Sequence, residues 1–587
     1  MERIHGSAIR RAECYVAAFA GGPRTFGHYL DREWSWANRR GPAYMRSASN
    51  PLWVVRSMRL RGRSPLCDPS EVDSRLAEIV ASLSLATEGA AGVPPETAAR
   101  AAIVATRVAE SMGGGTQERQ DVYYASLLRY IGCTSFAHET AWYGGGDDIA
   151  LLRTMTPADS GSLADVAKHI VGGAAKGAGA VTRARSVARL LGDPSMPKRL
   201  AEAHCNQAVR LAAHLGAAAR VTDVLGQTYE RFDGKGLPGG LRGDAISPLA
   251  RVMHVAYCAV LHGAFEGSAA ALEVVRARSG GELDPAVCDA FMRGAAEHLQ
   301  LIGATSVWDQ VAAAEPSPRQ FVSSERVPQV ARAFAHFVDL KSPYTIGHSV
   351  GVSQLCEAAL GRAGASDEER EQGRLAGFLH DLGRASVPNG IWDKPAPLNV
   401  VERERVEQHV YQSERVLARA EVLAPLAKLV GAHHERIDGS GYHRGSSGAL
   451  IPRVARYLAA ADVYQAMCEE RAFRPAHDTA AAAEALTKEA ATGRLDRDAV
   501  GHVLEAAGHA RPQLRSQPTF GLSEREVEVL VLLARGLTNK QIGKRLFISP
   551  RTVGHHVAHI YDKTAVKTRA AAALFAAEND LVAPPSK

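Results

Sequence analysis

The sequence lacks the features of a secreted or membrane-spanning protein. Its eight cysteines are scattered and form no CxxC pair, so neither a disulfide framework nor a cysteine-based zinc site is indicated. No apolar run approaches the roughly 20 residues that a membrane span needs. The apolar stretch 14–22 follows Arg10 and Arg11, as in a signal peptide, but Glu13 interrupts the pattern and no small-residue cleavage site follows. These absences predict a cytoplasmic protein with reduced thiols and no membrane partner.

Alternating β-branched residues, which are typical of strands, are also sparse. Alanine-rich amphipathic stretches dominate instead, for example 357–360, 374–379 and 480–489. The pattern predicts an all-α fold. A chain of 587 residues is too long for one core, and its net charge of +6 permits nucleic-acid binding without demanding it.

An internal repeat organises the middle of the chain. The segment QTYERFDG at 227–234 matches AHHERIDG at 432–439, a shift of 205 residues. Further pairs align in the same order: 246–251 with 451–456, His204 with His409, 127–132 with 378–383, and 281–284 with 493–496. Two copies of one helical domain are therefore predicted, rather than a solenoid.

The repeat and the composition of the segments between its copies divide the chain into six parts. These are an uncharacterised N-terminal arm at 1–65, copy one at 66–310, a linker at 311–324, copy two at 325–510, a second linker at 511–520, and a C-terminal domain at 521–587. Both linkers contain proline, which marks breaks between periodic segments.

Copy two contains a set of histidine and aspartate residues typical of metal ligands. They are His348, His380, Asp381, His409, His433, His434 and Asp462. Imidazole and carboxylate suit borderline and harder divalent cations. Any one of these histidines taken singly would be read as a helix cap or a surface residue. Five histidines and two aspartates in apolar helical surroundings would be costly to bury unpaired, and shared cations remove that cost.

The neighbours of these residues resemble the HD-GYP family of the HD phosphohydrolase superfamily. The matching segments are KSPYTIGHS at 341–349, HDLGR at 380–384, KP at 394–395, HHERIDGSGY at 433–442 and ADV at 461–463. The resemblance implies an all-α phosphodiesterase domain with two, sometimes three, iron or manganese ions. It also implies cyclic di-GMP or a related cyclic dinucleotide as the substrate.

The resemblance also implies a role for each residue. Asp381 would bridge two metals and act with Arg384 in catalysis. One metal would be held by His348, His380 and Asp462, and the other by His409, His433 and His434. Two cations about 3.5–4 Å apart lower the pKa of a bridging water and stabilise the charge of phosphoryl transfer.

Three departures from the family pattern affect this expectation. Arg384 replaces the lysine of the HDxGK motif, and its different shape would move the substrate. His443 replaces the proline of GYP, which puts the geometry of that loop in doubt. Tyr344 stands where some members use a glutamate for a third metal, so two metals are expected here.

Copy one has lost the ligand pattern. At the matching positions it has Arg129 and Tyr130 for His-Asp, Thr228 and Tyr229 for His-His, and Tyr257 for the last aspartate, and only His204 survives. Arginine stays protonated and cannot ligate a metal. A packing or dimerising scaffold is favoured over a small-molecule sensor pocket, because a fold alone implies no ligand.

Residues 521–582 resemble a LuxR-type helix-turn-helix. Ser523 is a suitable N-cap for a first helix that Gly536 ends, and residues 538–546 form the next helix. Ser549 and Pro550 would start the recognition helix. The residues expected to meet DNA are Lys540, Arg551, Thr552, His555, His556, His559, Lys563, Lys567 and Arg569. Double-stranded DNA bound by a homodimer is the expected complex.

Three functions stay open at this point. Copy two could hydrolyse a cyclic dinucleotide and so alter DNA binding, which the complete ligand set favours. It could instead keep metal and nucleotide as a sensor with negligible turnover, as the departures at Arg384 and His443 allow. Finally, both copies could serve only to dimerise a transcription factor.

Overall fold

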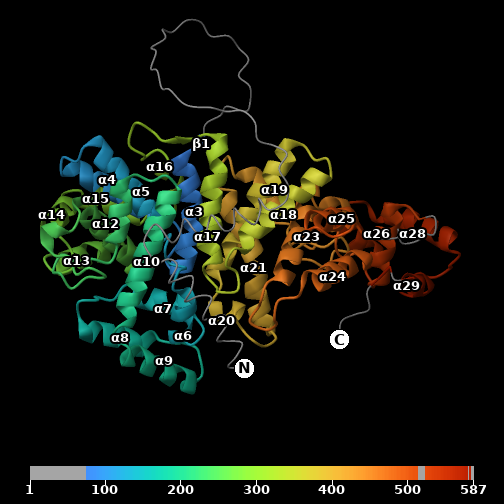
Figure 1. Cartoon of the computed structure of the whole chain (residues 1–587), viewed down its shortest axis with the longest axis horizontal. Helices are drawn as coiled ribbons and strands as arrows, with labels where there is room; N and C mark the ends of the chain where they lie inside the picture. The colour runs from blue at the N-terminus through green and yellow to red at the C-terminus, as the bar shows by residue number, and fades with distance from the viewer. Residues whose placement is uncertain (1–73, 513–521, 580, 583–587) are drawn as a thin grey trace, which may run out of the picture. The chain divides into compact units, whose positions relative to one another are not determined.

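A computed structural model describes residues 74–512, 522–579, 581 and 582. The arm predicted at 1–65 and nearly all of the linker predicted at 511–520 lie outside the described residues. Within the described part, the only sheet pairs β1 (Ser74–Arg75) antiparallel with β2 (Phe321–Val322). All other regular elements there are helices (Figure 1). The predicted all-α fold class is confirmed.

The first part of the described chain, up to residue 311, contains about half of the helices. They are α3 (Leu76–Ala91), α4 (Thr97–Ser111), α5 (Thr116–Leu128), α6 (Ala137–Tyr143), α7 (Asp148–Met155), α8 (Leu163–Gly173), α9 (Ala180–Gly192), α10 (Met196–His214), α11 (Ala219–Gly226), η2 (Gly243–Ala245), α12 (Pro248–Glu266), α13 (Ser268–Arg278), α14 (Pro285–Arg293), α15 (Ala295–Ile302) and α16 (Trp308–Val311).

The remaining helices belong to copy two and the C-terminal domain. Copy two has η3 (Ser324–Arg326), α17 (Val327–Asp339), α18 (His348–Arg362), α19 (Asp367–Leu379), η4 (Leu382–Ser386), α20 (Asn389–Trp392), α21 (Val400–Leu417), α22 (Ala424–Val430), η5 (Gly448–Leu450), α23 (Arg453–Cys468), α24 (Thr479–Ala491) and α25 (Arg497–Ala506). The C-terminal domain has α26 (Glu524–Ala534), α27 (Asn539–Leu546), α28 (Pro550–Thr564) and α29 (Arg569–Glu578).

The sequence repeat reappears as a repeat of helices. Helices α17, α18 and α19 each begin 251 residues after α3, α4 and α5 (327 − 76, 348 − 97 and 367 − 116). Elements α22, η5 and α23 each begin 205 residues after α11, η2 and α12 (424 − 219, 448 − 243 and 453 − 248). The two shifts differ by 46 residues because copy one has extra chain between α5 and α11, where α6 to α9 lie.

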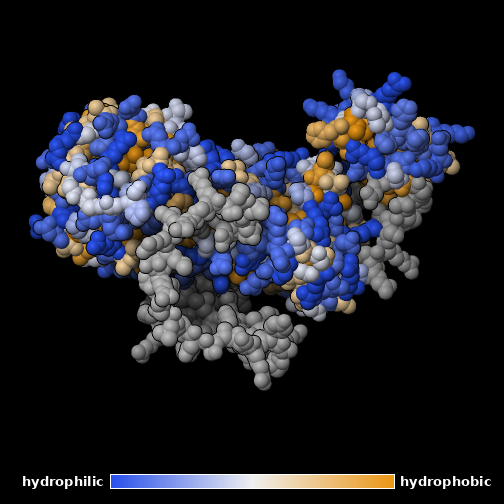
Figure 2. All heavy atoms as spheres, turned by 90° about the horizontal axis from the view of Figure 1, so that it is seen from above, coloured by the Kyte–Doolittle hydropathy of each residue, from blue (hydrophilic) through white to orange (hydrophobic). Residues whose placement is uncertain are grey.

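The two copies share a core. One continuous cluster of buried apolar side chains runs from Ala77 of α3 to Leu504 of α25. Tyr123, Phe291, Phe334 and Phe337 are its largest fully buried members. Burial of this apolar surface is the main stabilising term of the fold. Figure 2 shows that the visible face is largely hydrophilic, with apolar residues in small separate spots.

A buried ion pair also joins copy one to copy two. Asp148, the first residue of α7, pairs with Lys341 at 2.6 Å and accepts a hydrogen bond from the backbone N–H of Asn389 at 2.8 Å. Both charged side chains are almost fully buried, so removing one would strand the other in an apolar interior. Lys341 opens the segment that leads to His348, so copy one helps to fix the chain beside the predicted metal ligands.

Candidate metal centre and DNA-binding domain

Helix ends position most of the predicted ligands. His348 begins α18, whereas His380 and Asp381 follow the last turn of α19. His409 lies within α21, and Asp462 within α23. The pair His433 and His434 follows α22. Helices far apart in sequence therefore converge on one cluster, which we call the metal cluster and define as His348, His380, Asp381, His409, His433, His434 and Asp462.

The ligand atoms of the metal cluster fall into overlapping groups. Three sets each have atoms within 4.8 Å of one another: His409, His433 and His434; His348, His380 and Asp462; and His380, Asp381 and His433. The first two sets are those that the family resemblance assigned to separate metals.

Asp381 lies between these two sets. Its Oδ2 is 3.8 Å from Nε2 of His348 and 3.5 Å from Nε2 of His380. Its Oδ1 is 3.4 Å from Nε2 of His409. The two oxygens of one carboxylate thus face opposite sets, which is the orientation that a bridging ligand requires. Asp462 lies 3.2 Å from Nε2 of His348 and 3.9 Å from Nδ1 of His434.

The contact between His409 and His433 tests whether these residues suit a cation. Nδ1 of each ring faces a backbone carbonyl oxygen, Val406 for His409 and Val430 for His433. A carbonyl only accepts, so each Nδ1 must carry the proton. The two Nε2 atoms then present lone pairs to each other at 3.4 Å. This repulsive contact is relieved by a cation that both nitrogens bind.

His380 shows the same need for a partner. Its Nδ1 donates to the carbonyl oxygen of Gly377 at 2.9 Å, which leaves Nε2 as an acceptor. That Nε2 atom is buried and has no hydrogen-bond partner. Orphaned buried polar atoms are costly in a folded protein. The donor set of imidazoles and carboxylates fits iron or manganese better than softer, thiolate-preferring metals.

The pKa values of the residues in the metal cluster are shifted in different directions. Burial and the neighbouring His380 and His409 hold the pKa of His433 down at about 3. Burial would also lower the pKa of His348, but Glu469 and Asp462 outweigh it and raise that pKa to about 10. Burial would raise the pKa of Asp381, but His380 and Arg384 outweigh it, so its pKa lies well below the usual range. The carboxylate of Asp381 and the imidazole of His433 are therefore ready to ligate a cation at neutral pH.

The family departures have clear structural settings. Arg384 donates to Oδ2 of Asp381 at 3.1 Å, and its guanidinium lies 3.9 Å from the ring centroid of Trp392. His443 lies 3.6 Å from a carboxylate oxygen of Glu414, with its Nδ1 buried and unpartnered. Arg384 thus borders the metal cluster, and His443 faces away from it towards α21.

Sequence reasoning missed two residues beside the metal cluster. Nδ1 of His348 contacts a carboxylate oxygen of Glu469 at 2.9 Å, and Arg471 pairs with that carboxylate at 3.0 Å. The available signal was spacing, because Glu469 follows Asp462 by seven residues. Seven residues make two helical turns, so Glu469, which directly follows the last residue of α23, lies on the same side of the helix as Asp462.

In copy one, an arginine fills the equivalent place. The guanidinium of Arg129 lies 3.6 Å from the ring centroid of Tyr257 and donates to the carbonyl oxygen of Thr228 at 3.3 Å. The surviving His204 contacts the hydroxyl of Tyr229 at 2.8 Å, and burial lowers its pKa to about 4. An arginine and aromatic rings thus stand where copy two has the imidazoles and carboxylates of the metal cluster.

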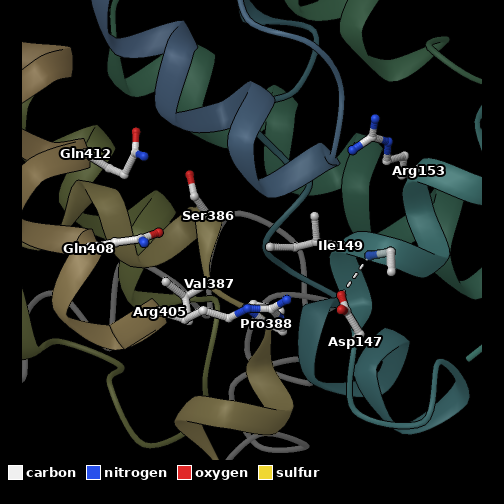
Figure 3. A pocket seen from close by; sticks show the side chains of 10 residues that line it. Asp147, Ile149, Arg153, Ser386, Val387, Pro388, Arg405, Gln408 and Gln412 are labelled. Atoms are coloured by element: carbon white, nitrogen blue, oxygen red, sulfur yellow. Dashed lines mark hydrogen bonds between the residues drawn. The ribbon is translucent and has the colours of Figure 1, made fainter. Parts of the chain in front are cut away.

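A separate cavity of about 290 Å³ lies between α7 of copy one and η4 and α21 of copy two (Figure 3). Its lining includes Asp147, Arg153, Ser386, Arg405 and Gln412. No member of the metal cluster lines it. Asp147 instead accepts from the backbone N–H of Ala150 and so caps α7.

The C-terminal domain has the predicted helix starts. Ser523 caps α26, and Ser549 caps α28 with Pro550 at its first position. Val553 and Ile560 of α28 are buried in a small core of the domain's own. These features confirm the predicted caps.

The predicted DNA contacts differ in their surroundings. Lys540, Arg551, Thr552, His555, His559, Lys563 and Lys567 are exposed, and His556 and Arg569 are partly buried. Glu526 forms an ion pair with Lys563 at 2.6 Å and also lies 3.6 Å from His559. Arg569 donates to Asn539 and to the carbonyl oxygen of Leu537. Lys563 and Arg569 therefore also hold the domain together.

Family models now match what this geometry suggests. The family described as "HD domain" matches residues 192–287 and 332–499, and "Bacterial regulatory proteins, luxR family" matches 521–576. Residues 192–287 and 332–499 thus belong to the HD-domain family, and residues 521–576 to the luxR family of regulatory proteins. Within the described residues, no helix is both long and apolar enough to cross a bilayer.

Characterised relatives of the HD-domain protein are phosphodiesterases. 3'3'-cGAMP-specific phosphodiesterase 3 of Vibrio cholerae is 28% identical over 405 residues, covering 68% of this chain and 88% of the relative. A cyclic di-GMP phosphodiesterase of Pseudomonas aeruginosa is 34% identical over 167 residues, covering 28% of this chain and 40% of the relative.

A solved structure supports the fold. The crystal structure of a cyclic GMP-AMP phosphodiesterase of V. cholerae has a TM-score of 0.52 and 24% identity, covering 74% of this chain and 98% of that one. At this identity the likeness shows the fold alone. The predicted class of enzyme, a metal-dependent phosphodiesterase, is confirmed by the sequence relatives and the HD-domain match.

Proposed function

We propose that copy two, at about 325–510, hydrolyses cyclic di-GMP or a related cyclic dinucleotide such as cyclic GMP-AMP, using two iron or manganese ions. The observation that carries the proposal is the position of Asp381, whose two oxygens face two different groups of histidines. The names of the relatives favour the same substrate class.

The side chains suggest how the reaction would proceed. When bound, the paired cations supply a hydroxide at neutral pH and accept charge from the phosphoryl oxygens. Asp381 would bridge them, with His348, His380 and Asp462 on one side and His409, His433 and His434 on the other. Arg384 is within reach of Asp381, and we propose that it orients a phosphate of the substrate as the reacting bond breaks.

We propose that the C-terminal domain binds double-stranded DNA as a homodimer in the cytoplasm. Exposed Arg551 and His555 on α28 would reach base edges, and Lys540 and Lys567 would contact phosphates. Metal and nucleotide occupancy of copy two would then regulate DNA binding. Copy one would act as the scaffold that supports copy two, because Asp148 of α7 pairs with Lys341 beside the metal cluster.

A single-turnover assay tests the catalytic proposal. The full chain, loaded with Mn²⁺ or anaerobically with Fe²⁺, is mixed with cyclic di-GMP or cyclic GMP-AMP. We expect linear product from the wild type and none from Asp381→Ala. Tight binding without product would support the alternative, a nucleotide sensor that Arg384 and His443 have made inactive. Absence of both metal and binding would leave only a dimerising scaffold.

The DNA-binding proposal needs a variant that spares the fold. Arg551 is exposed and makes no hydrogen bond or ion pair among the described residues, so Arg551→Ala should weaken specific DNA binding by roughly 1–3 kcal/mol without changing the thermal midpoint. Lys563→Ala is the comparison, since it breaks the pair with Glu526 and should lower stability as well. Unchanged DNA affinity in Arg551→Ala would contradict the proposed contact surface.

A further inference from the structure

Glu469 holds His348 from the side opposite the metal cluster. The carboxylate lies at the C-terminal end of α23 and is 17% exposed. Its Oε2 contacts Nδ1 of His348 at 2.9 Å, while Nε2 of the same ring points towards Asp462 at 3.2 Å. One ring nitrogen thus faces Glu469, and the other faces the proposed metal position.

His348 differs in this respect from three of the other histidines of the metal cluster. For His380, His409 and His433, Nδ1 faces the carbonyl oxygen of the residue three positions earlier. Those three histidines lie within a helix or just beyond its end, where such a carbonyl is available. His348 is the first residue of α18, and the carbonyl of Thr345 accepts from its backbone N–H instead. Its imidazole therefore needs an orienting acceptor from elsewhere in the fold.

Glu469 is itself held in place. Nε2 of Gln465 donates to its Oε1 at 2.8 Å, and Arg471 pairs with Oε2 at 3.0 Å. Arg471 also donates to the carbonyl oxygen of Tyr344 at 2.5 Å, in the loop just before His348. The carboxylate is thus braced from both sides independently of the imidazole.

We propose that Glu469 is a positioning residue for metal binding at His348. A carboxylate on Nδ1 fixes the proton there, leaves the Nε2 lone pair free for the cation, and strengthens that nitrogen as a ligand. The proposal rests on the proposed metal site. Loss of Glu469 lowers the affinity for the ion held by His348, His380 and Asp462. The affinity for the ion held by His409, His433 and His434 is unchanged.

Titration of the metal-free full chain with Mn²⁺ tests the proposal, with binding followed by calorimetry and by the electron paramagnetic resonance of free Mn²⁺. Glu469→Ala should weaken one of the two binding events by about 10- to 100-fold and leave the other unchanged. Glu469→Gln should lose less, because its amide oxygen still accepts from Nδ1. The matched control is Glu484→Gln at an exposed position of α24, which should behave as the wild type.

A double-mutant cycle separates positioning from a general effect on folding. If Glu469 acts through His348, Glu469→Ala should cost no further affinity in a His348→Ala background. An equal loss in both backgrounds, or no loss in the wild-type background, would overturn the proposal. Because the readout is metal affinity, a wild type that binds two ions without hydrolysing nucleotide would refute catalysis and still test Glu469.

Discussion

Copy one and copy two keep the same framework but differ in what fills its centre. In both, a glutamate accepts two backbone N–H groups of the following loop: Glu230 from Gly239 and Leu241, and Glu435 from Arg444 and Ser446. The loop therefore keeps its shape in both copies. At the centre, Arg129 and Tyr257 of copy one stand where copy two has His380 and Asp462.

This difference separates the folding requirement from the chemical one. Apolar packing and loop hydrogen bonds suffice to build the framework, because copy one has them without any metal-ligand set. A centre without metal ligands must be filled by other interactions. In copy one the guanidinium of Arg129 stacks over the ring of Tyr257 at this place. The histidines of copy two are thus not needed for the fold as such.

Substitutions at matched positions of the two copies should have very different effects. His433 of copy two corresponds to Thr228 of copy one (433 − 205 = 228). We expect His433→Ala to reduce hydrolysis by roughly 100-fold or more, because one cation loses a ligand. Thr228→Ala should leave turnover unchanged, since its hydroxyl only donates to the carbonyl oxygen of Leu225. Similar losses in the two variants would mean that the copies are not functionally distinct.

A matched pair of glycines compares packing with ligand placement. A Cβ on Gly383 would overlap the carbonyl oxygen of His409, and one on Gly132 would overlap that of His204. Each glycine-to-alanine change should lower the free energy of unfolding by about 1–3 kcal/mol. Chemical denaturation measures this loss in the metal-free chain. Only Gly383→Ala should also weaken Mn²⁺ binding, and weaker binding in Gly132→Ala would contradict the assignment of metal to copy two.

Metal binding should depend on pH through His348 but not through His433. With a pKa of about 10, His348 carries a proton in the metal-free chain at neutral pH, and a cation must displace it. Apparent Mn²⁺ affinity should therefore rise about tenfold per pH unit for each proton displaced, and fall as the pH is lowered. His433, with a pKa of about 3, adds no proton near neutrality. Calorimetry in two buffers of different ionisation enthalpy counts the protons, and a count of zero would contradict the prediction.

The smallest expected effect lies at the centre of copy one. Arg129→Ala removes the contact with Tyr257 and should lower the free energy of unfolding by about 0.5–2 kcal/mol. Hydrolysis and Mn²⁺ stoichiometry should stay unchanged. Thermal melts and metal analysis check this, with Arg129→Lys as the control that keeps the charge. A change in stoichiometry would show that copy one contributes to the metal centre.

Features that depend on local sequence patterns could be predicted from the sequence alone. The repeat, the helix caps at Ser523 and Ser549, and the membership of the HD and luxR families follow from short motifs with fixed spacing. The family resemblance predicts the seven ligand residues, and the structure brings all seven together. Their assignment to particular metals stays a prediction.

Contacts between distant segments could not be predicted in this way. Nothing in the sequence pairs Asp148 with Lys341, because the two are 193 residues apart and each resembles an ordinary surface charge. Likewise, Lys563 and Arg569 looked like free cations for DNA, yet both have partners within their own domain. The orientation of a long side chain depends on neighbours that only the folded chain provides.

The helical pattern, the duplication and the chemical identity of the ligands can be predicted from the amino-acid sequence, since they depend on residue type and spacing. Only the packing of the helices places the oxygens of Asp381 towards two groups of histidines, Glu469 against the ring of His348, and Arg129 at the centre of copy one. The physical reason is that directional contacts between buried polar groups arise only when helices remote in sequence pack around a common core.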